Sequence, residues 1–134
     1  KKLVKESGFP EVFDHIHLAG YVPNHELPAI YSLCSIFLYP SLRESFGIPI
    51  LEAMACGAPV ITSNTSSMPE IADDAALLVD PYHPEQITQA MIQLFNDQNL
   101  RNRLIEKGFQ QASRFTWEEM AKKVLTIYEK VLAS

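Results

Sequence analysis

Residues 36–63 read IFLYPSLRESFGIPILEAMACGAPVITS, and their pattern is the strongest indication of the fold class. Two short apolar runs, Ile36 to Pro40 and Pro59 to Ser63, enclose a helical pattern from Ile50 to Ala55. The runs are near-continuous rather than alternating in polarity, which is typical of strands covered by helices on both faces of a parallel sheet. The stretch therefore predicts a strand–helix–strand unit of an α/β fold.

The flanking sequence extends this unit. Pro49 near the start of the helix and Gly57 just past its end are residue types expected at helix termini. Two further apolar runs, Ile16 to Val22 and Ala76 to Val79, predict two more strands, and Leu27 to Tyr31 suggests a short helix. We therefore expect a Rossmann-like parallel sheet with helices on both faces and right-handed connections.

The last fifty residues predict helices. Apolar side chains share one face from Ile87 to Phe95 and continue from Leu100 to Gly108. Capping boxes are expected at Ser67 to Glu70 and at Thr116 to Glu119. We expect the stripe of the final helix to be core and packing surface; it consists of Trp117, Met120, Ala121, Val124, Leu125, Tyr128, Val131 and Leu132.

Composition indicates an ordinary globular domain. The chain has 134 residues, of which 47% are hydrophobic and 20% charged. A net charge of −5 and the lack of any basic run argue against nucleic-acid binding. Cys34 and Cys56 lie in apolar sequence, so we interpret them as small buried residues in a reducing compartment. Lys1 to Glu6 resemble the middle of a helix, which suggests a fragment of a longer protein.

Ligands of open parallel sheets bind at the carboxyl ends of the strands. After the strand that ends near Pro40 comes a loop with Glu44, then Gly47 and the start of a helix. Glycine allows a tight turn and a close approach of the backbone to a ligand. Pro49 has no N–H, but the free N–H groups of Phe46, Gly47, Ile48 and Ile50 at the helix start would form an anion site together with the helix dipole.

Glu44 and Glu52 leave three interpretations open. They could be an acid/base pair, but eight helical residues rise about 12 Å, whereas paired glycosidase carboxylates lie roughly 5 to 9.5 Å apart. The spacing better suits two contacts with different ends of a long ligand, each carboxylate accepting hydrogen bonds from sugar hydroxyls. Alternatively, both are solvated residues favoured by the helix dipole.

Other polar places have structural alternatives. Gly20 to Pro23 could flank a base through Tyr21, or could be a turn. Ser63 to Ser67 could reach a phosphate or sugar, or could only lead into the capping box. His15 and His17 share a face if extended, but no third metal ligand is suitably spaced, so we expect no metal site.

Several ordered motifs together resemble the C-terminal half of retaining glycosyltransferases of the GT-B fold, group 1 or family 4. Pro40 to Ile61 is similar to the family's motif of two glutamates separated by seven residues, with its flanks. Met68 to Ile71, Leu77 to Pro81 and Phe115 to Glu118 also fit, so the resemblance covers nearly the whole chain.

The resemblance implies a role for each site residue. Glu44, as the catalytic residue, would contact the transferred sugar, and Glu52 would bind the ribose hydroxyls. Backbone N–H groups of Ser45, Phe46, Gly47 and Ile48 would hold the sugar and diphosphate, while Tyr21 and Val22 would lie beside the base. The reaction would retain the sugar's configuration and use the nucleotide sugar as substrate, with no cofactor and no essential metal.

The resemblance also implies what surrounds residues 1–134. We expect a truncated C-terminal nucleotide-sugar-binding domain that lacks its first strands, the family's diphosphate-neutralising Arg and Lys, and the N-terminal acceptor domain. Alone it should be inactive and should repair its exposed apolar edges by self-association or strand rearrangement. A cytoplasmic location is expected, with membrane contact only through the missing domain.

Two alternatives to a transferase remain. One is a nucleotide-sugar epimerase or phosphorylase of the same fold, against which the motif flanks argue. The other is a noncatalytic α/β interaction module.

Overall fold

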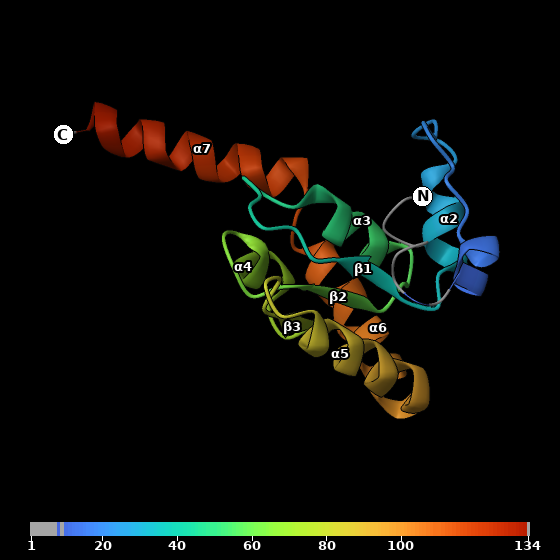
Figure 1. Cartoon of the computed structure of the whole chain (residues 1–134). Helices are drawn as coiled ribbons and strands as arrows, with labels where there is room; N and C mark the ends of the chain where they lie inside the picture. Colours follow the sequence, from blue (N-terminus) through green and yellow to red (C-terminus); the bar gives the residue numbers. More distant parts are fainter. Residues whose placement is uncertain (1–7, 9, 134) are drawn as a thin grey trace.

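A parallel three-stranded sheet forms the centre of the molecule (Figure 1). The computed structural model describes residue 8 and residues 10–133, so the expected helix at Lys1 to Glu6 lies outside the described residues. The strands β1 (Phe37–Tyr39), β2 (Val60–Ser63) and β3 (Ala76–Val79) lie side by side in chain order. Both pairs are parallel, which confirms the predicted α/β fold.

Helices account for most of the remaining chain. Their bounds are η1 (a 3₁₀ helix, Pro10–His15), α2 (Leu27–Leu33), α3 (Ile48–Ala55), α4 (Met68–Ala72), α5 (Pro84–Asn96), α6 (Gln98–Ser113) and α7 (Trp117–Leu132). The helices predicted around Leu27 to Tyr31 and Ile50 to Ala55 are confirmed.

The sheet has a hydrophobic cluster on each face because neighbouring residues of a strand point to opposite sides. Val60 of β2 packs with α2, α3 and α4, whereas Ile61 packs with α5 and α6. All four β2 side chains are buried, which explains its continuous apolar run. Cys34 and Cys56 contact the first cluster but are only half-buried, less than the sequence predicts.

Helix α6 fixes α3 in place. Gly108 of α6 lies so close to α3 that a Cβ added there would come within 3.2 Å of Met54 Cγ. Met54 is fully buried, so this close approach is part of the core. Helix α3, which carries Glu52, therefore packs directly against α6.

The prediction of a strand from Ile16 to Val22 is wrong. That segment has no regular structure between η1 and α2, and Leu18 and Tyr21 are 77% and 87% exposed. In the described sheet no strand pairs with the remaining edge of β1. An apolar run without a neighbour to hydrogen-bond cannot form a ladder, so local composition alone is insufficient.

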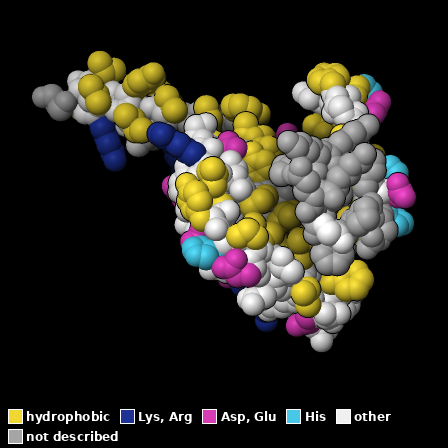
Figure 2. All heavy atoms as spheres, viewed as in Figure 1, with side chains coloured by type: hydrophobic (Ala, Val, Ile, Leu, Met, Phe, Trp, Pro, Cys, Tyr) yellow, Lys and Arg dark blue, Asp and Glu magenta, His cyan; other side chains and the backbone are white. Residues whose placement is uncertain are grey.

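The predicted packing of two helical stripes is also incorrect. In α5, Ala90 and Leu94 are buried as expected, but Met91 and Phe95 are exposed, although α5 packs on β2, β3 and α6. Helix α7 contains no buried residue and extends away from the body of the domain (Figure 1). Figure 2 shows that the hydrophobic side chains of this protruding helix are exposed to solvent.

Candidate functional site

The loop after β1 carries Glu44, and two hydroxyls hold its carboxylate. Tyr39, the last residue of β1, donates to Glu44 Oε1 at 2.6 Å, and Ser41 Oγ donates to the same oxygen at 3.0 Å. Glu44 is half-buried. Its side chain is therefore anchored at one oxygen while part of its surface faces solvent.

The segment 63–67, which begins with the last residue of β2, holds this loop through its hydroxyls. Ser63 Oγ donates to the Ser41 carbonyl at 2.6 Å, and Ser66 Oγ donates to the Glu44 carbonyl at 2.7 Å. The Glu44 N–H donates back to Ser66 Oγ at 3.3 Å. Ser66 has a φ of 57°. The segment thus positions the Glu44 loop, a role that the sequence does not indicate because only the fold brings the two loops together.

Ser67 does not form the predicted capping box. It stands before α4 in a helical conformation and makes no side-chain cap. Its hydroxyl instead donates to the carbonyls of Glu44 and Phe46, at 3.1 and 3.0 Å. Thr116, by contrast, does accept from the Glu119 N–H at 3.1 Å, so that predicted cap is confirmed.

The backbone turns into α3 at Gly47, whose φ of +100° lies in the region that favours glycine. No described residue accepts a hydrogen bond from the N–H groups of Ser45, Phe46, Gly47 or Ile48. The Ile50 N–H, expected to be free, donates to the Gly47 carbonyl at 3.0 Å. The four consecutive free donors at the positive end of α3 can bind an anion.

Glu52 lies one turn further along α3, on its exposed side. The hydroxyl of Tyr31, from α2, donates to Glu52 Oε2 at 3.1 Å. Tyr31 itself is only 8% exposed. Thus each glutamate of the motif has a tyrosine partner from a neighbouring element, a pairing that nothing in the linear sequence signals.

These contacts change the acidity of both phenols. The hydrogen bond to Glu44, with burial as the lesser cause, raises the pKa of Tyr39 to about 12. Burial, followed by the hydrogen bond to Glu52, raises the pKa of Tyr31 to about 12. Both tyrosines are therefore neutral hydrogen-bond donors near neutral pH.

Tyr21 and Val22 belong to a segment that lies apart from the Glu44 loop. Their segment extends beside α2, whereas the Glu44 loop lies beyond α3, toward α7 (Figure 1). No hydrogen bond links the two residues to the loop within the described part of the chain. Their role beside a base stays a prediction. Among the described residues no group of His, Cys, Asp or Glu could hold a metal ion.

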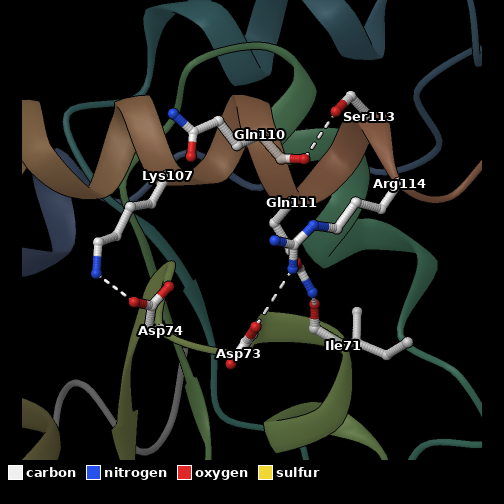
Figure 3. Close-up of polar contacts among 8 residues, drawn as sticks. All are labelled: Ile71, Asp73, Asp74, Lys107, Gln110, Gln111, Ser113 and Arg114. Atoms are coloured by element: carbon white, nitrogen blue, oxygen red, sulfur yellow. Dashed lines mark hydrogen bonds and ion pairs between the residues drawn. The ribbon is translucent and has the colours of Figure 1, made fainter.

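A second polar cluster joins α4 to α6 at an open cavity of about 290 Å³ (Figure 3). Lys107 pairs with Asp74, and Arg114 lies 3.5 Å from Asp73. Gln111 Nε2 donates to the Ile71 carbonyl at 2.9 Å, near the end of α4. Each charge in this cluster has an opposite partner, so it suits structural support better than the binding of an anion.

Comparison with known proteins supplies the family. The sequence pattern of the glycosyl transferases group 1 matches residues 1–111. The chain is 40% identical over 114 residues to the O-antigen chain mannosyltransferase B of Escherichia coli, covering 85% of this chain and 30% of that enzyme. The chain thus spans less than a third of this relative.

Solved structures agree with the fold. Sucrose-phosphate synthase from Thermosynechococcus elongatus superimposes with a TM-score of 0.84 at 27% identity, over 98% of this chain and 33% of that one. The C-terminal domain of a group 1 glycosyl transferase from Francisella tularensis gives 0.70 at 30% identity, over 84% and 58%.

None of the described helices is both long and apolar enough to span a membrane.

The family pattern covers the sheet, the Glu44 loop and α3, which carry the two glutamates and the free N–H groups. The chain therefore belongs to the glycosyl transferases group 1.

Proposed function

We propose that this chain forms the donor side of a glycosyltransferase site, in which a sugar leaves its nucleotide and joins an acceptor with retention of configuration. Glu44 contacts the transferred sugar, and the N–H groups of Ser45 to Ile48 hold the diphosphate. Glu52 binds the ribose hydroxyls. The nucleotide sugar is the substrate, and no essential metal is required.

One observation carries the proposal: within nine residues, a carboxylate, a set of N–H donors and a second carboxylate follow one another. This order matches the sugar, diphosphate and ribose of a nucleotide sugar. Glu44 provides an anchored carboxylate, four free N–H groups follow, and Glu52 provides a second carboxylate on the exposed side of α3. Carboxylates accept from hydroxyls, while a helix start binds phosphate. The sugar, diphosphate and ribose would lie along this line.

We propose mannose as the first sugar to test. The Escherichia coli relative at 40% identity is a mannosyltransferase by name. GDP-mannose is therefore the primary probe, with UDP-glucose and ADP-glucose as comparisons. The acceptor would be bound outside this chain, so the chain alone should bind donor without transferring the sugar.

Isothermal titration calorimetry on the chain and on two variants tests the proposal. We expect Glu52→Gln to weaken both GDP and GDP-mannose, because both contain ribose, by roughly tenfold or more for a lost charge-assisted bond. Glu44→Gln should weaken GDP-mannose but leave GDP unchanged. Glu106→Gln, on the exposed side of α6, is the control.

The proposal fails if none of the three nucleotide sugars binds the wild-type chain at millimolar concentration. It fails equally if Glu52→Gln binds every nucleotide as tightly as the wild type.

A further inference from the structure

Three aromatic rings form a row between the two glutamates. Tyr31 meets Phe37 edge-on, with ring centroids 5.2 Å apart and planes at 88°. Phe37 stacks on Tyr39 at 5.9 Å and 13°. Phe37 and Tyr39 are two residues apart in β1 and so share one face. At the two ends of the row, the Tyr31 hydroxyl donates to Glu52 and the Tyr39 hydroxyl donates to Glu44.

Each hydroxyl occupies only one carboxylate oxygen. Tyr39 and Ser41 both donate to Oε1 of Glu44, and no described residue donates to Oε2. Tyr31 donates to Oε2 of Glu52, and no described residue donates to Oε1. An ionised carboxylate has about four acceptor positions. Both glutamates therefore keep one open oxygen in a defined orientation.

The row can hold that orientation because its members are packed into the domain. Phe37 and Tyr39 are half-buried in β1, and Tyr31 belongs to the hydrophobic cluster around α3. Glutamate side chains at an exposed position otherwise sample many rotamers, whose restriction on binding reduces affinity. A neutral phenol fixes the carboxylate without neutralising its charge.

We propose that Tyr39 and Tyr31 are positioning residues: each phenol locks one oxygen of its glutamate and aims the other at a donor hydroxyl, of the sugar for Glu44 and of the ribose for Glu52. The inference rests on the proposed function for the identity of those hydroxyls. It goes further by assigning the two ends of the donor to two separate tyrosines joined by Phe37.

The pairing predicts two different binding defects. Tyr39→Phe should weaken GDP-mannose by about threefold to tenfold, the range expected for one hydrogen bond, and leave GDP unchanged. Tyr31→Phe should weaken both ligands by a similar factor. Tyr128→Phe, on the exposed helix α7, is the matched control. Calorimetry gives the affinities, and circular dichroism verifies that each variant is folded.

A second readout follows the hydrogen bonds without any ligand. In NMR titrations of chains with ¹³C-labelled tyrosine, the pKa of Tyr39 should fall from about 12 toward its ordinary value in Glu44→Gln. The pKa of Tyr31 should remain high in that variant. A phenol that only filled space would show no such response.

The outcomes separate this inference from the proposed function. If neither phenol's pKa responds to loss of its own glutamate, the positioning role is overturned, whatever binds. If the wild type binds GDP-mannose but Tyr39→Phe weakens GDP equally, or weakens neither ligand, the assignment of Tyr39 to the sugar end is overturned. If no nucleotide sugar binds the wild type, the proposed function fails and the donor hydroxyls assigned here fail with it, while the titration still decides whether the phenols orient the carboxylates.

Discussion

At the scale of single residues, Gly47 joins the Glu44 loop to α3 in a conformation that side chains with a Cβ rarely adopt. Its φ is +100°, and an added Cβ would lie 3.2 Å from Ile50 Cδ1. The free N–H groups on both sides of Gly47 depend on this turn. The residue thus links backbone geometry directly to the proposed diphosphate site.

Gly47→Ala should destabilise the fold by about 1–2 kcal/mol, the usual cost of a left-handed conformation for a residue with a Cβ. Urea unfolding followed by circular dichroism measures the change. Gly47→Asn adds the same Cβ but tolerates this region better. Equal losses in the two variants would show that crowding against Ile50, rather than backbone strain, dominates.

The two phenols also predict a dependence on alkaline pH. Their folded pKa values, about 12, lie above the ordinary 10. The stabilisation that they contribute is therefore fully present below pH 10 and is lost as pH rises from about 10 to about 12. Tyr31→Phe/Tyr39→Phe should lose less stability than the wild type over this window. If the urea midpoints of the two proteins fell equally between pH 10 and pH 12, the stabilising role of the two phenols would be contradicted.

The sequence located both glutamates and Gly47 because a strand end, a loop and a helix start are local patterns. It did not reveal Tyr31, Tyr39 or the hydroxyls of Ser66 and Ser67 as their supports. Tyr31 lies 21 residues before Glu52, and Ser66 lies 22 after Glu44. Such pairings follow from how β1, β2, α2 and α3 are packed, which no local pattern contains.

At the scale of elements, α6 and α7 have equal length and similar N-caps but opposite environments. Asp97 accepts from the Leu100 N–H at 2.8 Å and starts α6, which contributes to the core. Thr116 starts α7, none of whose residues is buried. Amphipathic periodicity predicted both helices correctly, but not that the stripe of α7 would remain uncovered.

The two caps should therefore differ in effect. Asp97→Ala should lower the global free energy of unfolding by about 1 kcal/mol, as lost N-caps usually do. Thr116→Ala should reduce the helical circular dichroism signal without moving the urea midpoint, because α7 can fray independently of the core. A midpoint shift in Thr116→Ala as large as in Asp97→Ala would show that α7 is coupled to the core.

At the scale of the whole molecule, two of the places where the described residues expose apolar side chains are extended enough to matter for association. Helix α7 presents its stripe, and Ile36 with Met91 and Phe95 lines an open apolar groove near β1. The strands lie in the order β1-β2-β3. Both expected responses to exposed edges stay predictions, and self-association is the one that these apolar surfaces allow to be tested in solution.

Sedimentation velocity should show an average mass that rises with protein concentration. Exposed apolar patches of this kind favour association. If the α7 stripe is responsible, the double variant Leu125→Lys/Leu132→Lys should reduce this association. If the groove is responsible, Phe95→Lys should reduce it instead. A constant monomer mass at every concentration would contradict the prediction.

The most direct test of the donor site is a titration of the ¹⁵N-labelled chain with GDP, followed by backbone amide NMR. We expect the largest shifts at Ser45, Phe46, Gly47 and Ile48, whose N–H groups have no partner among the described residues. Shifts confined to the cluster of Asp73, Lys107 and Arg114, or no shifts at millimolar GDP, would contradict it.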